Sequence, residues 1–195
     1  VFMELYPVDG EDYAPLQDAV EKLALHDAAI RFHGTNSAAL GNGLHVGFLG
    51  MLHAEIVQER LEREFDLELI ATAPSVTYEV VTSEGEVEEI SSPQHLPDPS
   101  EIEEIREPIT KAEILVPREH MGAVLQICQE KRGTMDTMRD IGTRLKMTYS
   151  LPLAEIVTSF HDELKSATSG FGSLEYEVVG YEPVDAVKIS ILVNK

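Results

Sequence analysis

The chain has 195 residues, 43% of them hydrophobic, and its 35 acidic and 15 basic side chains give a net charge of −20. This composition is typical of a globular protein of one or two domains, and the single cysteine, Cys128, excludes an internal disulfide framework. So negative a charge argues against non-specific nucleic-acid binding, and no apolar run approaches the ~20 residues that cross a bilayer.

The first part of the chain opens with a predicted strand, a helix and two further strands. The strand covers Phe2–Tyr6, and the helix begins near Asp12, a residue type that favours helix caps. Strands are expected at Ile30–His33 and Leu44–Phe48, divided by a stretch rich in Gly, Asn and Ser over residues 34–43. Together these elements give the order β-α-β-β.

A second helix and a closing strand complete this part. The helix is amphipathic, with one apolar face formed by Leu52, Ile56, Val57, Leu61 and Phe65. The closing strand is expected over residues 67–81, interrupted by Pro74. We therefore predict a β-α-β-β-α-β domain over residues 1–82.

Residues 83–107 differ from the rest in composition. They hold nine acids, one base and three prolines, a mixture typical of linkers, although residues 86–90 form a possible short strand. We expect an acidic linker between the first domain and a second one over residues 108–195.

The second domain repeats the same order of elements. A strand at Ile109–Val116 precedes a helix with an apolar stripe that ends near Gly133, and a hairpin then joins two strands around residues 141–142. Another helix begins at Pro152, and strands at Leu174–Val179 and Val187–Val193 close the sheet. The predicted fold class is α+β, with two ferredoxin-like sandwiches whose helices cover one sheet face.

Five bases lie within 16 residues that contain only two acids, Asp136 and Asp140. They are Lys131, Arg132, Arg139, Arg144 and Lys146. This basic window begins where a helix is expected to end and continues into the hairpin, a position that suits contact with phosphate oxygens. A merely solvated surface is the alternative interpretation.

Catalytic and metal signatures are sparse. No Walker-type phosphate loop is present, and the glycines between residues 41 and 50 favour a tight turn over an anion site. His53 with Glu55 is the least improbable metal-ligand pair, but a structural histidine is the favoured interpretation. Cys128 lies on an apolar helix stripe and is expected to fill the core. We predict no catalytic, cofactor-binding or metal-binding residues.

Several strings resemble one family of translation factors along the whole chain. GFLGMLHAEIVQERLEREFDLELIATAPSVTYEV at residues 47–80 is similar to the third domain of the LepA, or elongation factor 4, family. The opening LYPVDGEDYAPLQDAVEKLALHDAAI, then REPITKAEILVP, EKRG and LKSATSGFGSLEYEVVGYEPVDAVKISILVN, belong to the same pattern. The resemblance implies domains like the third and fifth of elongation factor G.

The family resemblance implies a non-catalytic, ribosome-docking fragment of a ribosome-dependent GTPase, proposed to act in elongation by back-translocation. GTP, Mg²⁺ and the hydrolytic residues would belong to a preceding domain that this fragment lacks. The first half would pack against that GTPase domain, and tRNA would meet a following C-terminal domain. A monomer in the cytoplasm is implied, with peripheral association with the inner face of the cell membrane possible.

The implied partner of the second half is ribosomal RNA near the sarcin-ricin loop and the stalk base. The candidate contacts are Lys131, Arg132, Arg139, Arg144, Lys146, Lys165 and Ser166. The family pattern supports Lys131-Arg132 and Lys165-Ser166, whereas the other three follow from charge alone. The alternative function is a small-molecule regulatory module, because paired ferredoxin-like domains often bind metabolites.

Overall fold

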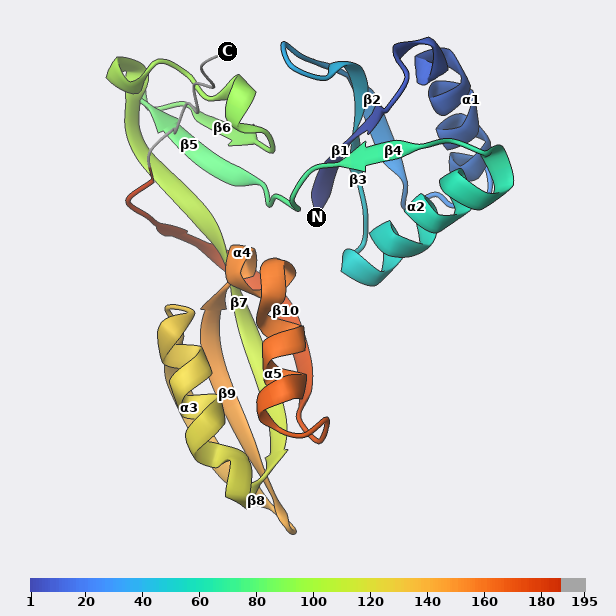
Figure 1. The fold of residues 1–195 in the computed structure, drawn as a ribbon. Coiled ribbons are helices and arrows are strands. Elements are labelled where there is room, and N and C mark those ends of the chain that lie inside the picture. Colours follow the sequence, from blue (N-terminus) through green and yellow to red (C-terminus); the bar gives the residue numbers. More distant parts are fainter. Residues whose placement is uncertain (187–195) are drawn as a thin grey trace, which may run out of the picture. The chain divides into compact units, whose positions relative to one another are not determined.

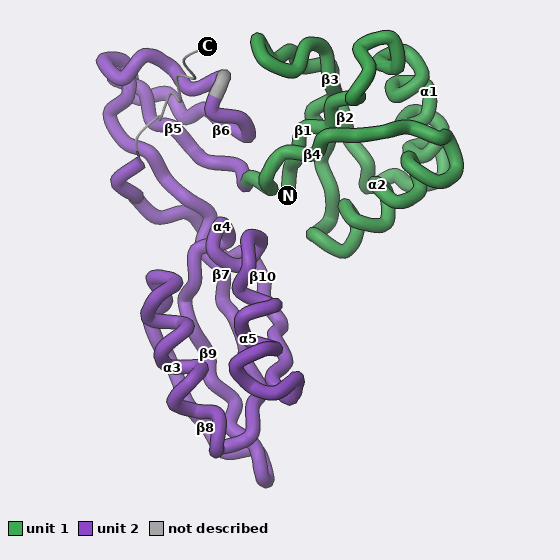
Figure 2. The backbone as a smooth tube through the Cα atoms, in the orientation of Figure 1, with its two compact units in different colours: residues 1–75 green, residues 76–195 purple. Residues whose placement is uncertain are grey.

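The computed structural model of the chain describes residues 1–186, apart from the side chain of Gln94. The chain forms two compact units, of which the first covers residues 1–75 and the second begins at Val76 (Figure 2). Each unit contains an antiparallel sheet with helices on one face (Figure 1). The predicted strand at Val187–Val193 lies outside the described residues.

Unit 1 is a four-stranded antiparallel sheet backed by two helices. Its elements are β1 Phe2–Pro7, a 3-10 turn at Gly10–Asp12, α1 Tyr13–Ala24, β2 Arg31–Ser37, β3 Gly41–Gly47, α2 Met51–Phe65 and β4 Leu69–Ala71. The strands lie in the order β2-β3-β1-β4, which is the ferredoxin-like arrangement. Apolar side chains from α1, α2, β1 and β3 share one core between the sheet and the helices.

Both helices of unit 1 form where the sequence predicts them, but details of their ends and faces differ. Asp12 precedes α1 without a capping side-chain bond, whereas Asp9 caps the 3-10 turn by accepting from the Glu11 amide at 3.0 Å. On α2, the buried residues are Ala54, Val57 and Leu61. Leu52 and Ile56, predicted to face the core, are 70% and 48% exposed. The buried stripe of α2 is therefore rotated away from the predicted one.

The hairpin of β2 and β3 extends through the glycine-rich stretch that was expected to divide two shorter strands. Thr35 pairs with Gly43, and Asn36 pairs with Asn42, whose side chains also share a hydrogen bond of 2.7 Å. Backbone ladder bonds need no side chain, so glycine does not end the strands here.

Unit 2 contains a longer sheet than the sequence predicts. Its strands are β5 Tyr78–Thr82, β6 Val87–Ile90, β7 Ile102–Pro117, β8 Thr134–Ile141, β9 Arg144–Pro152 and β10 Ser173–Pro183. Short 3-10 turns at Pro93–His95, Pro99–Glu101 and Arg118–His120 connect some of them. Strands β10, β7, β9 and β8 lie side by side in that order, which repeats the arrangement of unit 1. The expected fold class, with two ferredoxin-like sandwiches, is confirmed.

The helices of unit 2 cover one face of this sheet. Helix α3 spans Met121–Glu130, and the predicted helix after Pro152 is a continuous run of α4 Leu153–Glu155, a π turn at Ile156–Phe160 and α5 His161–Ala167. Their apolar side chains form one core with β7 and β9. The predicted core position of Cys128 is confirmed, because its side chain is fully buried there.

Residues 83–107 do not form the expected linker, and the unit boundary does not fall at residue 82. Strand β5, expected in the first domain, pairs with β6 and with the start of β7 in unit 2. The chain passes between units near Pro74, since Ser75 still pairs with Phe2 and Val76 is buried in unit 2. The acids of this segment hid its strands, because alternate positions such as Val80 and Ile90 are buried while the carboxylates face water.

Candidate nucleic-acid interface

Strand alternation in unit 2 separates the core from an open sheet face. On β7, Ala112 and Ile114 face the helices, so Lys111 and Glu113 face the other side. On β9, the same alternation puts Lys146 on the open side, opposite Leu145 and Met147. Within residues 76–186, no helix covers this second face (Figure 1).

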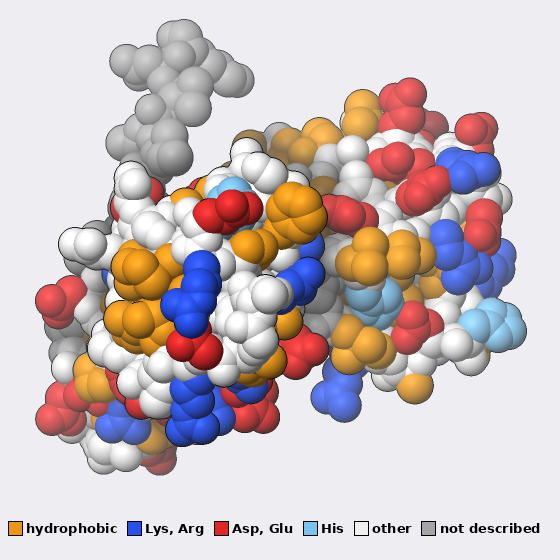
Figure 3. Space-filling view, turned by 90° about the horizontal axis from the view of Figure 1, so that it is seen from below, with side chains coloured by type: hydrophobic (Ala, Val, Ile, Leu, Met, Phe, Trp, Pro, Cys, Tyr) orange, Lys and Arg blue, Asp and Glu red, His pale blue; other side chains and the backbone are white. Residues whose placement is uncertain are grey.

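Four bases lie on the open side, and we call them the basic face: Lys111, Arg139, Arg144 and Lys146. Arg139 of β8 is directly opposite Lys146 of β9 in the antiparallel register, and Arg144 is at the start of the same strand. Seen from below, Lys and Arg side chains gather on unit 2 among hydrophobic side chains (Figure 3). The fold thus brings together bases from three strands.

These bases differ in how they are paired. Lys146 Nζ lies 2.7 Å from Glu113 Oε2, and this hydrogen bond lowers the pKa of the Glu113 carboxyl below its usual value. Arg139 and Arg144 are exposed and form no ion pair with any residue in the described part of the chain. Their guanidinium groups are available to an external anion such as a phosphate.

Arg132 is fixed by carboxylates of its own chain. Its guanidinium binds both oxygens of Glu107, at 2.6 and 3.0 Å, and its Nε donates to Glu155 at 3.0 Å. The Glu107 side chain is only 6% exposed, and its hydrogen bonds raise the pKa of Arg132. Arg132 therefore ties the end of α3 to β7 and α4, and its predicted RNA contact stays a prediction.

Lys131 has a similar structural arrangement. Its ammonium donates to Ser159 Oγ at 3.0 Å and lies 2.9 Å from Glu163 Oε1, and its side chain is largely buried. The Ser159 hydroxyl also donates to Glu163, at 2.6 Å. This triad joins α3 to the helix after β9 and leaves Lys131 few free donors.

Protonation of Glu163 should loosen that triad. The hydrogen bonds from Ser159 and then from Lys131 lower the pKa of the Glu163 carboxyl from its ordinary value of 4.5. A lowered native pKa stabilises the fold above pH 4.5, and this contribution disappears as the pH falls through the native value. We expect urea titrations between pH 5 and 3 to show a smaller loss of stability for Glu163→Gln than for the wild type, the difference being below ~1 kcal/mol because the pair is solvated. Equal pH dependence in the two proteins would contradict this.

Lys165 and Ser166 lie apart from the basic face. Both belong to α5, in the helical layer on the other side of the sheet. Ser166 is exposed, and Lys165 Nζ donates to the Gly170 carbonyl at 3.3 Å. The structure thus brings three of the seven predicted contacts together and separates Lys131, Arg132, Lys165 and Ser166 from them.

Sequence reasoning missed Lys111, the fourth member of the basic face. It lies 28 residues before Arg139, outside the basic window. Its signal was present in the predicted strand at residues 109–116, since alternation from Ala112 and Ile114 puts Lys111 on the face opposite the core.

The described residues offer little for catalysis or metal binding. Burial raises the pKa of the Cys128 thiol to about 12, so the thiolate is scarce at neutral pH. His53 has the predicted structural role, since Nδ1 accepts from the Leu49 amide at 3.0 Å and Nε2 lies 2.8 Å from Asp27. Among residues 1–186, no group of three His, Cys, Asp or Glu residues could hold a metal ion.

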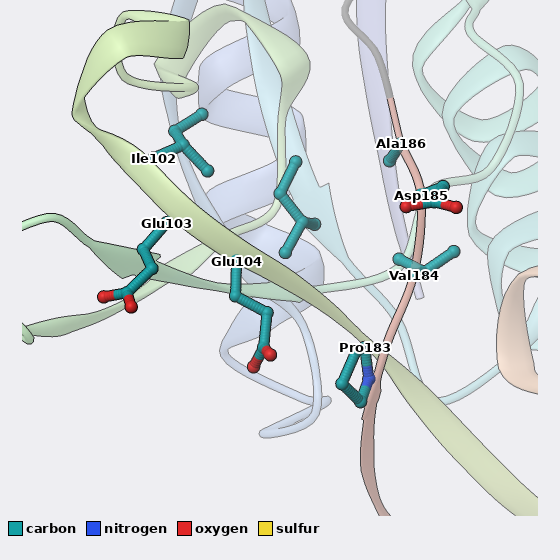
Figure 4. Close-up of a pocket in the computed structure, with 8 residues that line it drawn as sticks. Ile102, Glu103, Glu104, Pro183, Val184, Asp185 and Ala186 are labelled. Carbon is teal, nitrogen blue, oxygen red and sulfur yellow. The ribbon is translucent and has the colours of Figure 1, made fainter.

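A hollow between the start of β7 and the end of β10 bears on the metabolite alternative. It is lined by Ile102, Glu103, Glu104, Ile105, Pro183, Val184, Asp185 and Ala186. Figure 4 shows that the carboxylates of Glu103 and Glu104 do not converge with that of Asp185 on one point. Binding pockets usually aim a few polar groups at one ligand, and this hollow does not.

No helix within residues 1–186 has the length and apolar character needed to span a bilayer.

Comparison with known proteins agrees with the family resemblance. A family model described as elongation factor G C-terminus matches residues 104–192. Proteins named elongation factor 4 are 51% identical over 195 residues in Limosilactobacillus fermentum, 53% over 196 in Clostridioides difficile, and 53% over 197 in Thermus thermophilus. Each match covers the whole of this chain, which spans about a third of the relatives' length (32 to 33%).

One solved structure supports the fold. A crystal structure of a Thermus thermophilus protein superposes with a TM-score of 0.62 at 20% identity, covering 94% of this chain and 40% of the other. Because about half of its residues are identical to those of the elongation factor 4 relatives along its whole length, the chain belongs to the elongation factor 4 (LepA) family of translation factors.

Proposed function

We propose that this chain is the ribosome-docking part of a longer elongation-factor-4-type GTPase, and that unit 2 contacts ribosomal RNA through the basic face. The observation that carries the proposal is the pair Arg139 and Arg144, two guanidinium groups without carboxylate partners in the described chain, on a sheet face that no helix of unit 2 covers. In a chain of net charge −20, such a surface is the one suited to a polyanion.

The distribution of acids supports one orientation on RNA. Residues 83–107 carry a net charge of −8, whereas residues 108–195 carry −2 despite being more than three times as many. Phosphates would repel the β5–β6 part of unit 2 and attract the basic face, so charge would direct how the unit approaches. RNA near the sarcin-ricin loop and the stalk base is the proposed target.

Unit 1 carries a different kind of surface. Leu49, Leu52 and Ile56 are exposed near the start of α2, and apolar side chains gathered in this way are typical of contact surfaces. We propose that the GTPase domain of the full-length protein covers them. GTP, Mg²⁺ and hydrolysis would belong to that domain, tRNA contact to a C-terminal domain, and back-translocation to the whole factor, acting as a cytoplasmic monomer.

Neutralising the basic face tests the RNA contact. For the 195-residue chain binding to 70S ribosomes, we expect Arg139→Gln and Arg144→Gln each to weaken affinity and to lower the slope of log affinity against log salt by about one. The measurement is a set of binding titrations at several salt concentrations.

The matched control changes the same charge elsewhere. Arg31→Gln and Arg63→Gln remove two exposed bases from unit 1, and we expect them to leave the salt slope unchanged. If the double variant Arg139→Gln/Arg144→Gln binds ribosomes with the affinity and slope of the wild type, the basic face has no part in docking.

A further inference from the structure

One aromatic side chain of unit 2 is held in water by a well-ordered loop. Phe171 is 56% exposed, whereas the other five phenylalanines, all within residues 1–186, are buried or half-buried. Its position follows from the turn that ends α5, in which Ser169 and Gly170 have left-handed backbone conformations. A large apolar group so exposed suggests that something covers it.

The loop holding Phe171 is fixed by hydrogen bonds on both sides. The Gly170 amide donates to the Lys165 carbonyl at 2.7 Å, and the Phe171 amide donates to the Thr168 carbonyl at 2.9 Å. The buried Thr168 hydroxyl donates to the Leu164 carbonyl at 2.7 Å and accepts from the Gly172 amide at 2.8 Å. The ring is thus presented in advance, which reduces the entropy lost on binding.

A hollow of about 520 Å³ lies beside this ring, lined by Pro117, Arg118, Glu119, Thr143, Arg144 and Phe171. The His120 ring stacks near Phe171, with centroids 6.5 Å apart and planes at 20°. Arg118 is engaged by Asp140, whereas Arg144 forms no ion pair with a described residue. The hollow therefore combines an aromatic wall with one available guanidinium.

We infer that this hollow is a nucleobase site: an unstacked base of RNA stacks on Phe171, and its phosphate meets Arg144. The inference rests on the proposed function, because Arg144 belongs both to the hollow and to the basic face. An apolar protein segment would use Phe171 but has no need of the unpaired cation, so charge complementarity favours RNA. Proteins commonly recognise unstacked RNA bases by pairing aromatic faces with nearby cations.

The inference predicts that the aromatic face, and not apolar bulk alone, is needed. For the 195-residue chain binding to 70S ribosomes, we expect Phe171→Leu to weaken affinity about 5- to 150-fold, as for loss of one base stack, and Phe171→Tyr to retain it. Because stacking releases no counterions, the salt slope should stay that of the wild type. The exposed position should leave the melting temperature nearly unchanged, which a thermal scan verifies.

A photo-crosslinking phenylalanine analogue at position 171 gives an independent test. We expect it to crosslink to an unpaired nucleotide of ribosomal RNA. Crosslinks only to protein, wild-type affinity for Phe171→Leu, or equal losses for the Leu and Tyr variants would each overturn the base site. If Arg139→Gln/Arg144→Gln still lowers the salt slope, docking on RNA stands while the base contact fails; if it does not, the proposed function itself has failed.

Discussion

Replacing Arg132 with Ala should destabilise unit 2 by about 2–3 kcal/mol. The Glu107 carboxylate, 6% exposed, would lose both guanidinium bonds and remain buried without its countercharge. Breaking a buried pair costs roughly 3–5 kcal/mol, and we expect a smaller effect because Arg132 is 46% exposed and water can partly replace it. Urea denaturation followed by circular dichroism measures the change.

A double-mutant cycle separates the pair from the loss of side-chain packing. Glu107→Gln in the Arg132→Ala background removes the buried charge, so part of the lost stability should return. Additive effects of the two substitutions would contradict the buried pair. Arg139→Ala is the matched control, since it removes an exposed arginine of the same unit and should change stability by less than ~0.5 kcal/mol.

Adding one methyl group at Gly43 should destabilise unit 1 by about 2–3 kcal/mol. A Cβ there would lie 2.4 and 2.6 Å from ring carbons of Tyr6 and 2.8 Å from the Leu5 carbonyl oxygen. The ring has little room to move, because Tyr6 is buried and its hydroxyl donates to Glu4 at 2.6 Å. Overpacking of this kind typically costs ~1–3 kcal/mol, and thermal unfolding of Gly43→Ala measures it.

Gly10→Ala is the control for Gly43. A Cβ at Gly10 meets no atom within 4 Å, and its backbone is not left-handed, so we expect almost no change. Equal stability of Gly43→Ala and Gly10→Ala would mean that Tyr6 yields easily. Tyr6→Leu combined with Gly43→Ala should recover part of the loss, because the smaller side chain leaves space for the methyl group.

The candidate site shows where local charge is a poor guide. Lys131, Arg132, Arg139, Arg144 and Lys146 look alike as a basic window, yet the fold treats them differently. Arg132 meets Glu107, 25 residues earlier, and Lys131 meets Glu163, 32 residues later. Partners so distant leave no trace in the local pattern, so the distinction between a structural base and an available one came only with the coordinates.

The α2 helix shows a similar limit for the core. Leu52 and Val57 are equally apolar in the sequence, and periodicity assigns both to one stripe. The sheet of unit 1 covers Ala54, Val57 and Leu61 and leaves Leu52 and Ile56 in water. Periodicity predicts that a helix has an apolar face, but the exact rotation depends on the surface against which it packs.

By itself, the sequence determined the order of the strands and helices, the two ferredoxin-like units and the family. These depend on residue alternation, turn residues and long strings, all of which are local in the chain. The tertiary structure alone placed β5 in unit 2, paired Lys131 and Arg132 with carboxylates, and added Lys111 to the basic face. Each of these outcomes depends on pairing between distant segments, and the free energy of such pairing is set by the assembled sheet.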